Sequence, residues 1–476
     1  MSPTIASFIS AIGIAGLFLL DRDKKSRVSN SLWIPTVWLF FSSSRAASQW
    51  LGMSPPPADM ASAYLEGSPI DRVLLMALEV AALIVVIGRW RRVSSVLLRN
   101  WPIWLFFSYA ALSITWSDYP LVTFKHWIKG IGDLIMVLIV LTEADVPEAV
   151  KRLVTRLGFV LVPLSLLFIR YYPSLGRTYT MDWTPEPIGV ATQKNGLGEL
   201  CDMFGLALLW HFRNAYNDRK KTNRKLRLLA LGAVLAIIVW LLWICNSMTS
   251  ICALSLAGGV MLLSTRPAFR HRPAFVHFFI AGVLIFSMYA LFFQSSGSLL
   301  ASLGRNPTLT GRTTVWPQLI DLVNHPLVGV GYESFWLGPR LEKVWVITEG
   351  LRINEAHSGY VEIFITLGWI GLALLGALIA TGYRNVIAAY RRDPDVGGLR
   401  IAWFLAPLIT GFTEAAFRMM GLTWIVFLLA TANSQWDPTR KTDRRVRPAR
   451  QLQRAPEESH SVHEEALVGG STDDNS

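Results

Sequence analysis

Charged residues are scarce in this chain of 476 residues. Asp, Glu, Lys and Arg make up only 16% of it, whereas 52% of the residues are hydrophobic. A soluble protein of this length needs more charge to cover its surface. The mean hydropathy is +0.39, and the apolar residues form runs about as long as a bilayer crossing, roughly 17–25 residues. These features exclude a soluble globular fold and indicate membrane helices.

Cysteine is almost absent, with only Cys201, Cys245 and Cys252 in the whole chain. Their spacing matches neither a metal-binding motif nor a disulfide framework, so the sequence predicts neither. The pattern of a cleavable signal peptide is also missing, because the positive charges follow the first apolar run instead of preceding it. We therefore expect residues 5–20 to be retained as the first helix.

The formal net charge of +12 does not indicate nucleic-acid binding, because no basic face with interleaved aromatic residues lies outside the apolar segments. The Lys and Arg residues instead form short blocks between those segments, such as DRDKKSR at 21–27 and RWRR at 89–92. Blocks of this kind mark the cytoplasmic side of a membrane protein. The charges thus predict an N-terminus outside and a C-terminus inside.

The fold class that follows is an all-α polytopic membrane protein with about 12–13 transmembrane helices. The candidate segments alternate in direction, so that every strongly basic loop lies inside: 5–20, 31–47, 72–88, 102–116, 128–143, 157–170, 196–212, 228–245, 250–265, 274–294, 359–381, 400–416 and 420–433. We predict a transmembrane domain over residues 1–434, which includes a large outer loop at 295–357. Residues 435–476 form a polar tail that is expected to be disordered and cytoplasmic.

The outer loop carries Arg305 and Arg312, although positive charge is depleted on that side of a membrane. After Arg312, Thr313 or Thr314 can cap a helix and Pro317 suits its first turn. The apolar residues that follow share one face by their spacing: Trp316, Leu319, Ile320 and Val323. This predicts an amphipathic helix on the membrane surface, with Arg312 at an N-terminus that suits a phosphate. Contacts with lipid headgroups or loop carbonyls explain the two arginines equally well.

The stretch NEAHSGYVEIF places His357 where an apolar helix begins. A histidine titrates near neutral pH and can take a proton from an acceptor hydroxyl; the alternative is a histidine that caps the next helix. Glu355 or Glu362 could orient the ring. Glu362 lies inside the apolar run, where ionisable residues are costly and often functional. Together with Tyr360, it is a candidate substrate-binding residue.

Two long segments carry a resemblance to a known family. The segments TLTGRTTVWPQLIDLVNHPLVGVGYESFW and NEAHSGYVEIFITLGWIGL resemble the C-terminal core of the O-antigen ligase and polymerase superfamily. SITWSDYP and GVATQKNGLGEL resemble its exopolysaccharide-polymerase branch. The resemblance extends over most of the chain between residues 113 and 429. It implies a GT-C-like, metal-independent, inverting glycosyltransferase that needs no cofactor.

The resemblance also implies a substrate and a location. The substrate would be an oligosaccharide linked to undecaprenyl diphosphate, used at the periplasmic face of the bacterial inner membrane, and other polysaccharide export proteins would be partners. Arg312 would bind the diphosphate with support from Arg305, and His357 would assist the acceptor hydroxyl. The turn NSMTSICALSLAG lacks an arginine that the ligase branch commonly carries. Three residues are candidates to replace that charge: Arg170, Arg177 and Lys194.

The missing arginine favours a polymerase of repeat units over an O-antigen ligase that transfers the glycan to lipid A–core. A third interpretation is a component of a polysaccharide or lipid transporter. A transporter predicts ionisable residues near the middle of the bilayer, for which the sequence offers Glu79 and Asp133.

Overall fold

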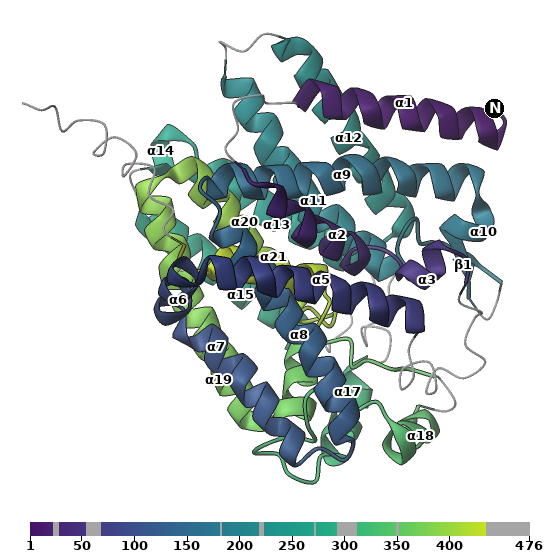
Figure 1. The fold of residues 1–476 in the computed structure, drawn as a ribbon, viewed down its shortest axis with the longest axis vertical. Coiled ribbons are helices and arrows are strands. Elements are labelled where there is room, and N and C mark those ends of the chain that lie inside the picture. The colour runs from purple at the N-terminus through teal and green to yellow at the C-terminus, as the bar shows by residue number, and fades with distance from the viewer. Residues whose placement is uncertain are drawn as a thin grey trace, which may run out of the picture. The chain divides into compact units, whose positions relative to one another are not determined.

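The computed structural model describes residues 1–21, 28–53, 68–180, 183–218, 223–270, 273–292, 312–348 and 352–434 (Figure 1). The elements are α1 (Pro3–Asp21), η1 (Asn30–Leu32), α2 (Trp33–Ser42), α3 (Ala47–Trp50), α5 (Pro69–Gly88), α6 (Trp90–Arg99), α7 (Trp101–Leu112), η2 (Ser113–Thr115), α8 (Pro120–Leu141), α9 (Val146–Tyr171), α10 (Pro173–Gly176), β1 (Arg177–Tyr179), β2 (Pro185–Pro187), α11 (Lys194–Asn217), α12 (Arg224–Cys245), α13 (Met248–Ser264), α14 (Pro267–Arg270), α15 (Pro273–Phe292), α17 (Arg312–Asp321), α18 (Gly338–Ile347), α19 (Gly359–Arg392), α20 (Pro394–Thr410) and α21 (Leu422–Thr431). The protein is an all-α polytopic membrane protein, as predicted.

Each predicted membrane segment overlaps a helix, but α20 ends at Thr410, so the last residues of the predicted segment 400–416 lie in a loop. Within the described ranges, four helices are long and apolar enough to cross a membrane: α1, α9, α12 and α19. By contrast, α2 has only 10 residues. A helix of that length rises about 15 Å, half of the hydrocarbon thickness. The predicted segment 31–47 therefore does not cross the bilayer as one helix. The chain turns after α2, where Arg45 donates a hydrogen bond to the carbonyl of Gly189 (3.0 Å).

The centre of the bundle is formed by α11, α13 and α20, whereas α1 lies at its periphery beside α9 (Figure 1). Every residue of α20 from Gly397 to Thr410 is buried. The one charged residue of this stretch, Arg400, donates hydrogen bonds to the carbonyls of Ala430 and Ala432 (2.7 and 2.6 Å). In α1, by contrast, only Ala6 is buried. Large apolar side chains of α1 are exposed, as expected for contact with lipid acyl chains: Ile5, Phe8, Ile9, Ile12, Phe18 and Leu19.

The helix α19 is interrupted at Gly368, whose φ of 66° and ψ of −164° lie outside the helical region. Residues 326–331 run beside this break and complete its hydrogen bonds. The amides of Val330 and Gly331 donate to the carbonyls of residues 365 and 366 (3.2 and 2.9 Å), and the amides of residues 369 and 370 donate to the carbonyls of Pro326 and Leu327 (3.0 and 3.1 Å). A broken helix inside a membrane protein requires such partners. The motifs HPLVGVG and ITLGWIGL are thus paired through their backbones.

The predicted surface helix exists, but protein covers its apolar face. α17 begins at Arg312, and its Leu319 and the following Val323 are 0% and 5% exposed. They pack with residues of α18 and α19, including Leu341 and Phe364. Ile320 points away and is 39% exposed. The membrane-surface assignment is therefore wrong for this face, because helical periodicity reports burial without distinguishing lipid from protein.

Two predictions concern residues outside the described ranges: Arg305 in the outer loop and the tail over residues 435–476. The three cysteines lie within the described ranges and are free thiols.

Candidate functional site

Four segments that are distant in the sequence meet at the candidate site. They are the glutamate loop (residues 326–337), the histidine loop (residues 352–358), the arginine loop (residues 411–421) and the N-terminus of α11. Ion pairs and hydrogen bonds join them. The first three segments connect helices, and loops positioned by a rigid scaffold are common carriers of function.

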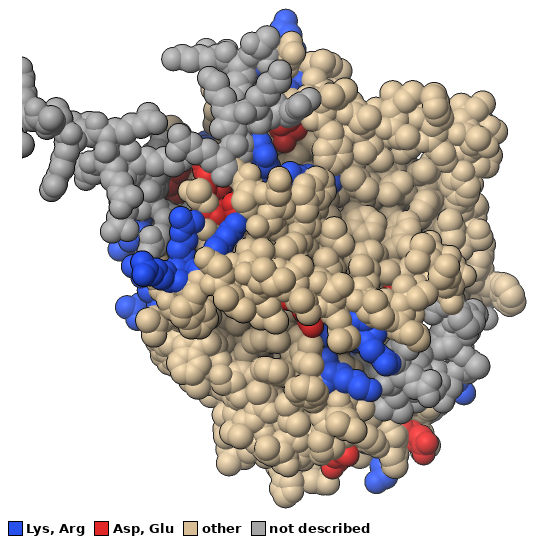
Figure 2. All heavy atoms as spheres, viewed as in Figure 1, with Lys and Arg blue, Asp and Glu red and all other residues tan. Residues whose placement is uncertain are grey.

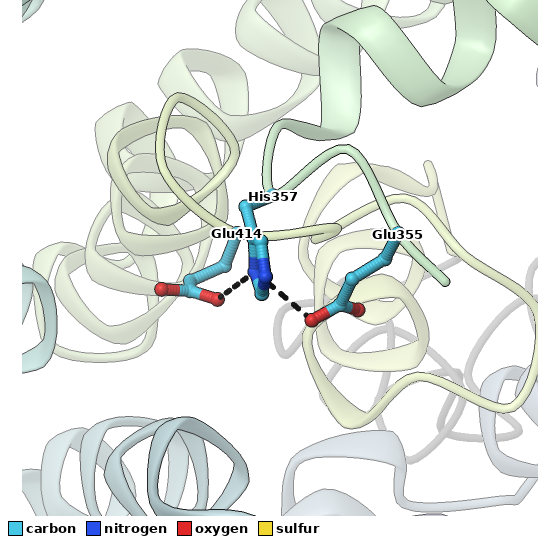
Figure 3. A group of neighbouring side chains, drawn as sticks. All are labelled: Glu355, His357 and Glu414. Carbon is cyan, nitrogen blue, oxygen red and sulfur yellow. Dashed lines mark ion pairs between the residues drawn. The ribbon is translucent and has the colours of Figure 1, made fainter. Parts of the chain in front are cut away.

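His357 lies between two carboxylates (Figure 3). Its Nδ1 is 3.0 Å from Oε1 of Glu355 in the same loop and 3.6 Å from Oε2 of Glu414 in the arginine loop. The His357 side chain is 26% exposed, whereas that of Glu414 is only 7% exposed. Two carboxylates thus flank the same ring nitrogen. The ring is therefore oriented from both sides and still accessible.

The backbone of His357 adopts a positive φ of 50°. Residues other than glycine rarely adopt this conformation, and it persists where the surroundings enforce it. Here the neighbours on both sides are fixed. The amide of Ala356 donates to Glu362 Oε1 (2.5 Å), and the amide of Gly359 donates to the carbonyl of Gly411 (2.8 Å). The side chain of Ser358 caps α19 by accepting from the amide of residue 361.

Arg418 joins the histidine loop to the glutamate loop. Its Nε is 3.1 Å from Glu333 Oε2, and its Nη1 is 3.6 Å from Glu355 Oε2. The carbonyl of Glu333 lies 3.0 Å from Nδ1 of His126 on α8. Glu333 also has a positive φ, of 53°. Met420 in the arginine loop has a positive φ as well, of 55°. Residues with this strained conformation thus occur on all three loops that form the site, which is where such strain is commonly retained.

The fourth segment supplies Asn195, at the start of α11. Its amide nitrogen donates to Glu414 Oε2 (3.0 Å), the same oxygen that faces His357. One turn later, Glu199 accepts a hydrogen bond from Thr423 at the start of α21 (3.5 Å). The motif GVATQKNGLGEL therefore contributes the residue that orients Glu414.

Glu355, His357 and Glu414 each offer one ligand atom, and these atoms lie within 4.8 Å of one another. Imidazole and carboxylate are ligands of Zn²⁺ and Mn²⁺, so the three groups could hold such an ion. However, Arg418 and Asn195 already contact the two carboxylates. A cation would compete with the Arg418 guanidinium for Glu355. The contacts therefore favour an oriented imidazole over a metal centre.

Two predicted residues near His357 fix the structure around it. Glu362 is 7% exposed and accepts from the Trp336 indole (3.0 Å) as well as from the amide of Ala356. Tyr360 donates to the carbonyl of Leu408 (3.1 Å). Both residues belong to the first turn of α19. In the structure they position the histidine loop.

The predicted basic residues are spread over the chain. Arg312 is the first residue of α17. Arg170 is exposed at the end of α9, and Arg177 on β1 donates through Nε to the carbonyl of residue 169 (3.1 Å). Lys194 forms an ion pair with Glu186 on β2. Lys194 directly precedes Asn195, so it lies beside the site in sequence, whereas no contact brings Arg170 or Arg177 to His357 in the described residues.

The sequence analysis missed four residues of the site: Asn195, Glu333, Glu414 and Arg418. A signal was present for two of them. Glu414 and Arg418 interrupt an otherwise apolar region, and the predicted spans placed Glu414 inside the membrane. An ionisable residue in such a position is a functional indicator.

Comparison with known proteins gives two matches. Residues 233–376 match the family model described as O-antigen ligase. The chain is 27% identical over 307 residues to the exopolysaccharide production protein ExoQ of Rhizobium meliloti (strain 1021). The aligned region covers 62% of this chain and 67% of that protein. These matches support a function of the O-antigen ligase or polymerase type. They confirm that this chain is similar to the O-antigen ligase and polymerase superfamily, on its exopolysaccharide branch.

Proposed function

We propose that the protein polymerises oligosaccharide repeat units carried on undecaprenyl diphosphate, at the periplasmic face of the bacterial inner membrane. The observation that carries this proposal is His357, held between Glu355 and Glu414 on loops that connect the membrane helices. A sugar hydroxyl is a poor nucleophile, and an oriented imidazole is the group best suited to accept its proton near neutral pH. The similarity to an exopolysaccharide production protein supports a glycan as the substrate.

The reaction is a single displacement with inversion. The acceptor hydroxyl oxygen attacks the anomeric carbon of the donor sugar, and the bond from that carbon to the phosphate oxygen breaks. The acceptor proton passes to His357. Because Nδ1 faces the carboxylates, the proton is taken by Nε2. Glu355 and Glu414 stabilise the resulting imidazolium, and general-base assistance of this kind contributes typically about 10²–10⁴-fold in rate.

The departing diphosphate carries the negative charge that develops in the transition state. Arg312 begins α17, where the free amides of a helix N-terminus also favour an anion. Its guanidinium can bind two phosphate oxygens at once, whereas lysine acts as a point charge. We therefore expect Arg312→Lys to be nearly as damaging as Arg312→Ala in a polymer synthesis assay. A fully active Lys variant would exclude the bidentate contact.

A ligase is the second candidate, because the matching family model is described as O-antigen ligase. Ligase and polymerase share the donor and differ in the acceptor. Deleting the gene and examining both surface glycans separates them. Loss of high-mass secreted polysaccharide with intact lipopolysaccharide supports a polymerase, whereas bare lipid A–core with polymer left on its carrier supports a ligase. Complementation with His357→Ala is expected to restore neither glycan.

We further propose that the reaction needs no metal ion. Arg418 provides the positive charge beside Glu355 that a cation would otherwise supply. Dialysis of the purified protein against EDTA should leave the polymerisation rate unchanged. A loss of activity that Mn²⁺, Zn²⁺ or Mg²⁺ restores would instead assign Glu355, His357 and Glu414 as metal ligands.

A further inference from the structure

A cavity lies at the C-terminal end of the glutamate loop, where Leu337 forms part of its lining. This outer pocket has a volume of about 460 Å³. Three segments form it: the turn between α7 and α8, the end of α17 and the start of α18. It is lined by Asp118, Tyr119, Asp321, Leu322, Asn324, Leu337, Pro339, Arg340 and Lys343.

The motif SITWSDYP builds one wall of the outer pocket. The hydroxyl of Ser113 accepts from the amide of Tyr332 (2.9 Å), which fixes the glutamate loop against α7. Asp118 Oδ2 pairs with Arg340 Nη2 (2.5 Å). The Tyr119 hydroxyl packs against Gly338, whose φ is +52° and which has no room for a Cβ atom. The motif therefore holds the loop and α18 in place and shapes the cavity.

The lining combines opposite charges in equal number. Asp118 and Asp321 are acidic, Arg340 and Lys343 are basic, and Asn324 adds an amide. Acidic and basic side chains also lie close together at the lower end of the face in Figure 2, where α17 and α18 lie. Within the described residues, Nη1 of Arg340 is buried without a hydrogen-bond partner. Buried donors of this kind usually have a hydrogen-bond partner in the functional state, because leaving one unsatisfied destabilises the folded protein.

We propose that the outer pocket binds a glycan segment of the substrate, as a hydroxyl-rich and electrically neutral ligand. Sugar hydroxyls both donate and accept, so they can satisfy the carboxylates, the amide and the guanidinium together. The Tyr119 ring offers an apolar face beside these groups. A diphosphate would instead require an excess of cations, and the two carboxylates of the pocket oppose it. This inference rests on the proposed function, since it assigns a subsite to the same substrate.

The outer pocket is close enough to the candidate site to hold the same chain of sugars. Glu333 contacts Arg418 in the site, and Leu337 lines the pocket. They are four positions apart in the sequence, so their backbones lie at most about 14 Å apart. A glycan held in the pocket would thus lie a few sugar units from His357. The pocket would position the chain without taking part in the chemical step.

The test uses full-length protein in lipid nanodiscs. The probe is a set of oligosaccharides released by partial acid hydrolysis from the polysaccharide that the host secretes, labelled at the reducing end. The double variant Asp321→Asn/Lys343→Gln removes one charge of each sign from the lining, and both residues are exposed, so the fold should tolerate it. Glu342→Gln is the matched control, because Glu342 is equally exposed on α18 but does not line the pocket. Inorganic pyrophosphate in excess serves as a competitor.

The double variant should bind the oligosaccharides at least fivefold more weakly than the wild type, Glu342→Gln should bind them equally well, and pyrophosphate should not displace them. Equal binding by the double variant, absence of binding by the wild type, or displacement by pyrophosphate would each overturn the assignment. His357→Ala separates this proposal from the proposed function. It should bind the probe like the wild type while making no polymer. If His357→Ala makes polymer normally, the catalytic proposal fails even where pocket binding holds.

Discussion

Two clusters in this chain join a histidine to a carboxylate and an arginine. In the first, Nε2 of His211 on α11 lies 3.2 Å from Oδ1 of Asp21, the last residue of α1. Arg227 on α12 donates to the same oxygen at 2.9 Å. The second cluster is that of His357 and Arg418 in the candidate site. The chemical groups are similar, but their settings differ.

The first cluster joins three helices, and the His211 side chain is only 4% exposed on regular helical backbone. The second lies on loops, and the His357 side chain is 26% exposed on backbone with a positive φ. A buried cluster between helices stabilises packing, whereas an accessible one on strained backbone is typical of a functional site. A histidine beside a carboxylate therefore does not indicate catalysis by itself. Accessibility and backbone conformation distinguish the two clusters.

The largest effect is expected from removing both charges that flank the site histidine. Glu355→Gln/Glu414→Gln should lower the polymerisation rate by roughly 10²-fold, because the imidazolium loses its stabilising charges and the ring its orientation. The rate is measured in nanodiscs per mole of folded protein. Asp21→Asn, which alters the other cluster in the same way, is the control. An equal loss of rate in Asp21→Asn would remove the distinction between the clusters.

The next effect concerns the break in α19 that supports the histidine loop. A Cβ at Gly368 would lie 2.4 Å from the backbone of Leu327, whereas one at Gly376 would meet nothing within 4 Å. Gly368→Ala should therefore destabilise the protein by about 1–3 kcal/mol and lower the rate about tenfold through the displaced loop. Gly376→Ala should change neither quantity. The check is to measure the thermal unfolding and the polymerisation rate of both variants. A Gly368→Ala variant with wild-type stability and rate would contradict the prediction.

A smaller effect on the polymerisation rate is expected from Glu362→Gln. This change weakens the hydrogen bonds that the carboxylate accepts from the Trp336 indole and from the amide of Ala356. The loss should be about 1.5–3 kcal/mol in stability, as for hydrogen bonds to charged groups, with only a few-fold loss of rate. Combining it with Trp336→Phe should cost less than the sum of the two single changes, because both remove one shared interaction. If the stability losses of the two single variants simply add in the double variant, Glu362 does not stabilise the protein through Trp336.

The smallest effect on rate is predicted for His211→Ala. It should lower stability by about 1 kcal/mol, because Asp21 and Arg227 lose their buried neighbour. The rate per mole of folded protein should stay at the wild-type value. A large loss of rate in correctly folded His211→Ala would mean that the first cluster also serves catalysis.

The sequence predicted the helices well because each is encoded by a local apolar run. The sequence also singled out His357 at the start of such a run, and its catalytic role stays a prediction. It could not predict the partners Glu414 and Asn195, since they approach only through the packing of α11, α19 and α20. Nor could it distinguish lipid from protein as the cover of Leu319, because both select for the same apolar residues.

The central claim is tested most directly by the release of undecaprenyl diphosphate from a purified lipid-linked donor in nanodiscs. Wild type, His357→Ala and His211→Ala are compared at equal amounts of folded protein. We expect roughly hundredfold slower release for His357→Ala and the wild-type rate for His211→Ala. Equal release by wild type and His357→Ala would contradict the assignment of His357 as the residue that takes the acceptor proton.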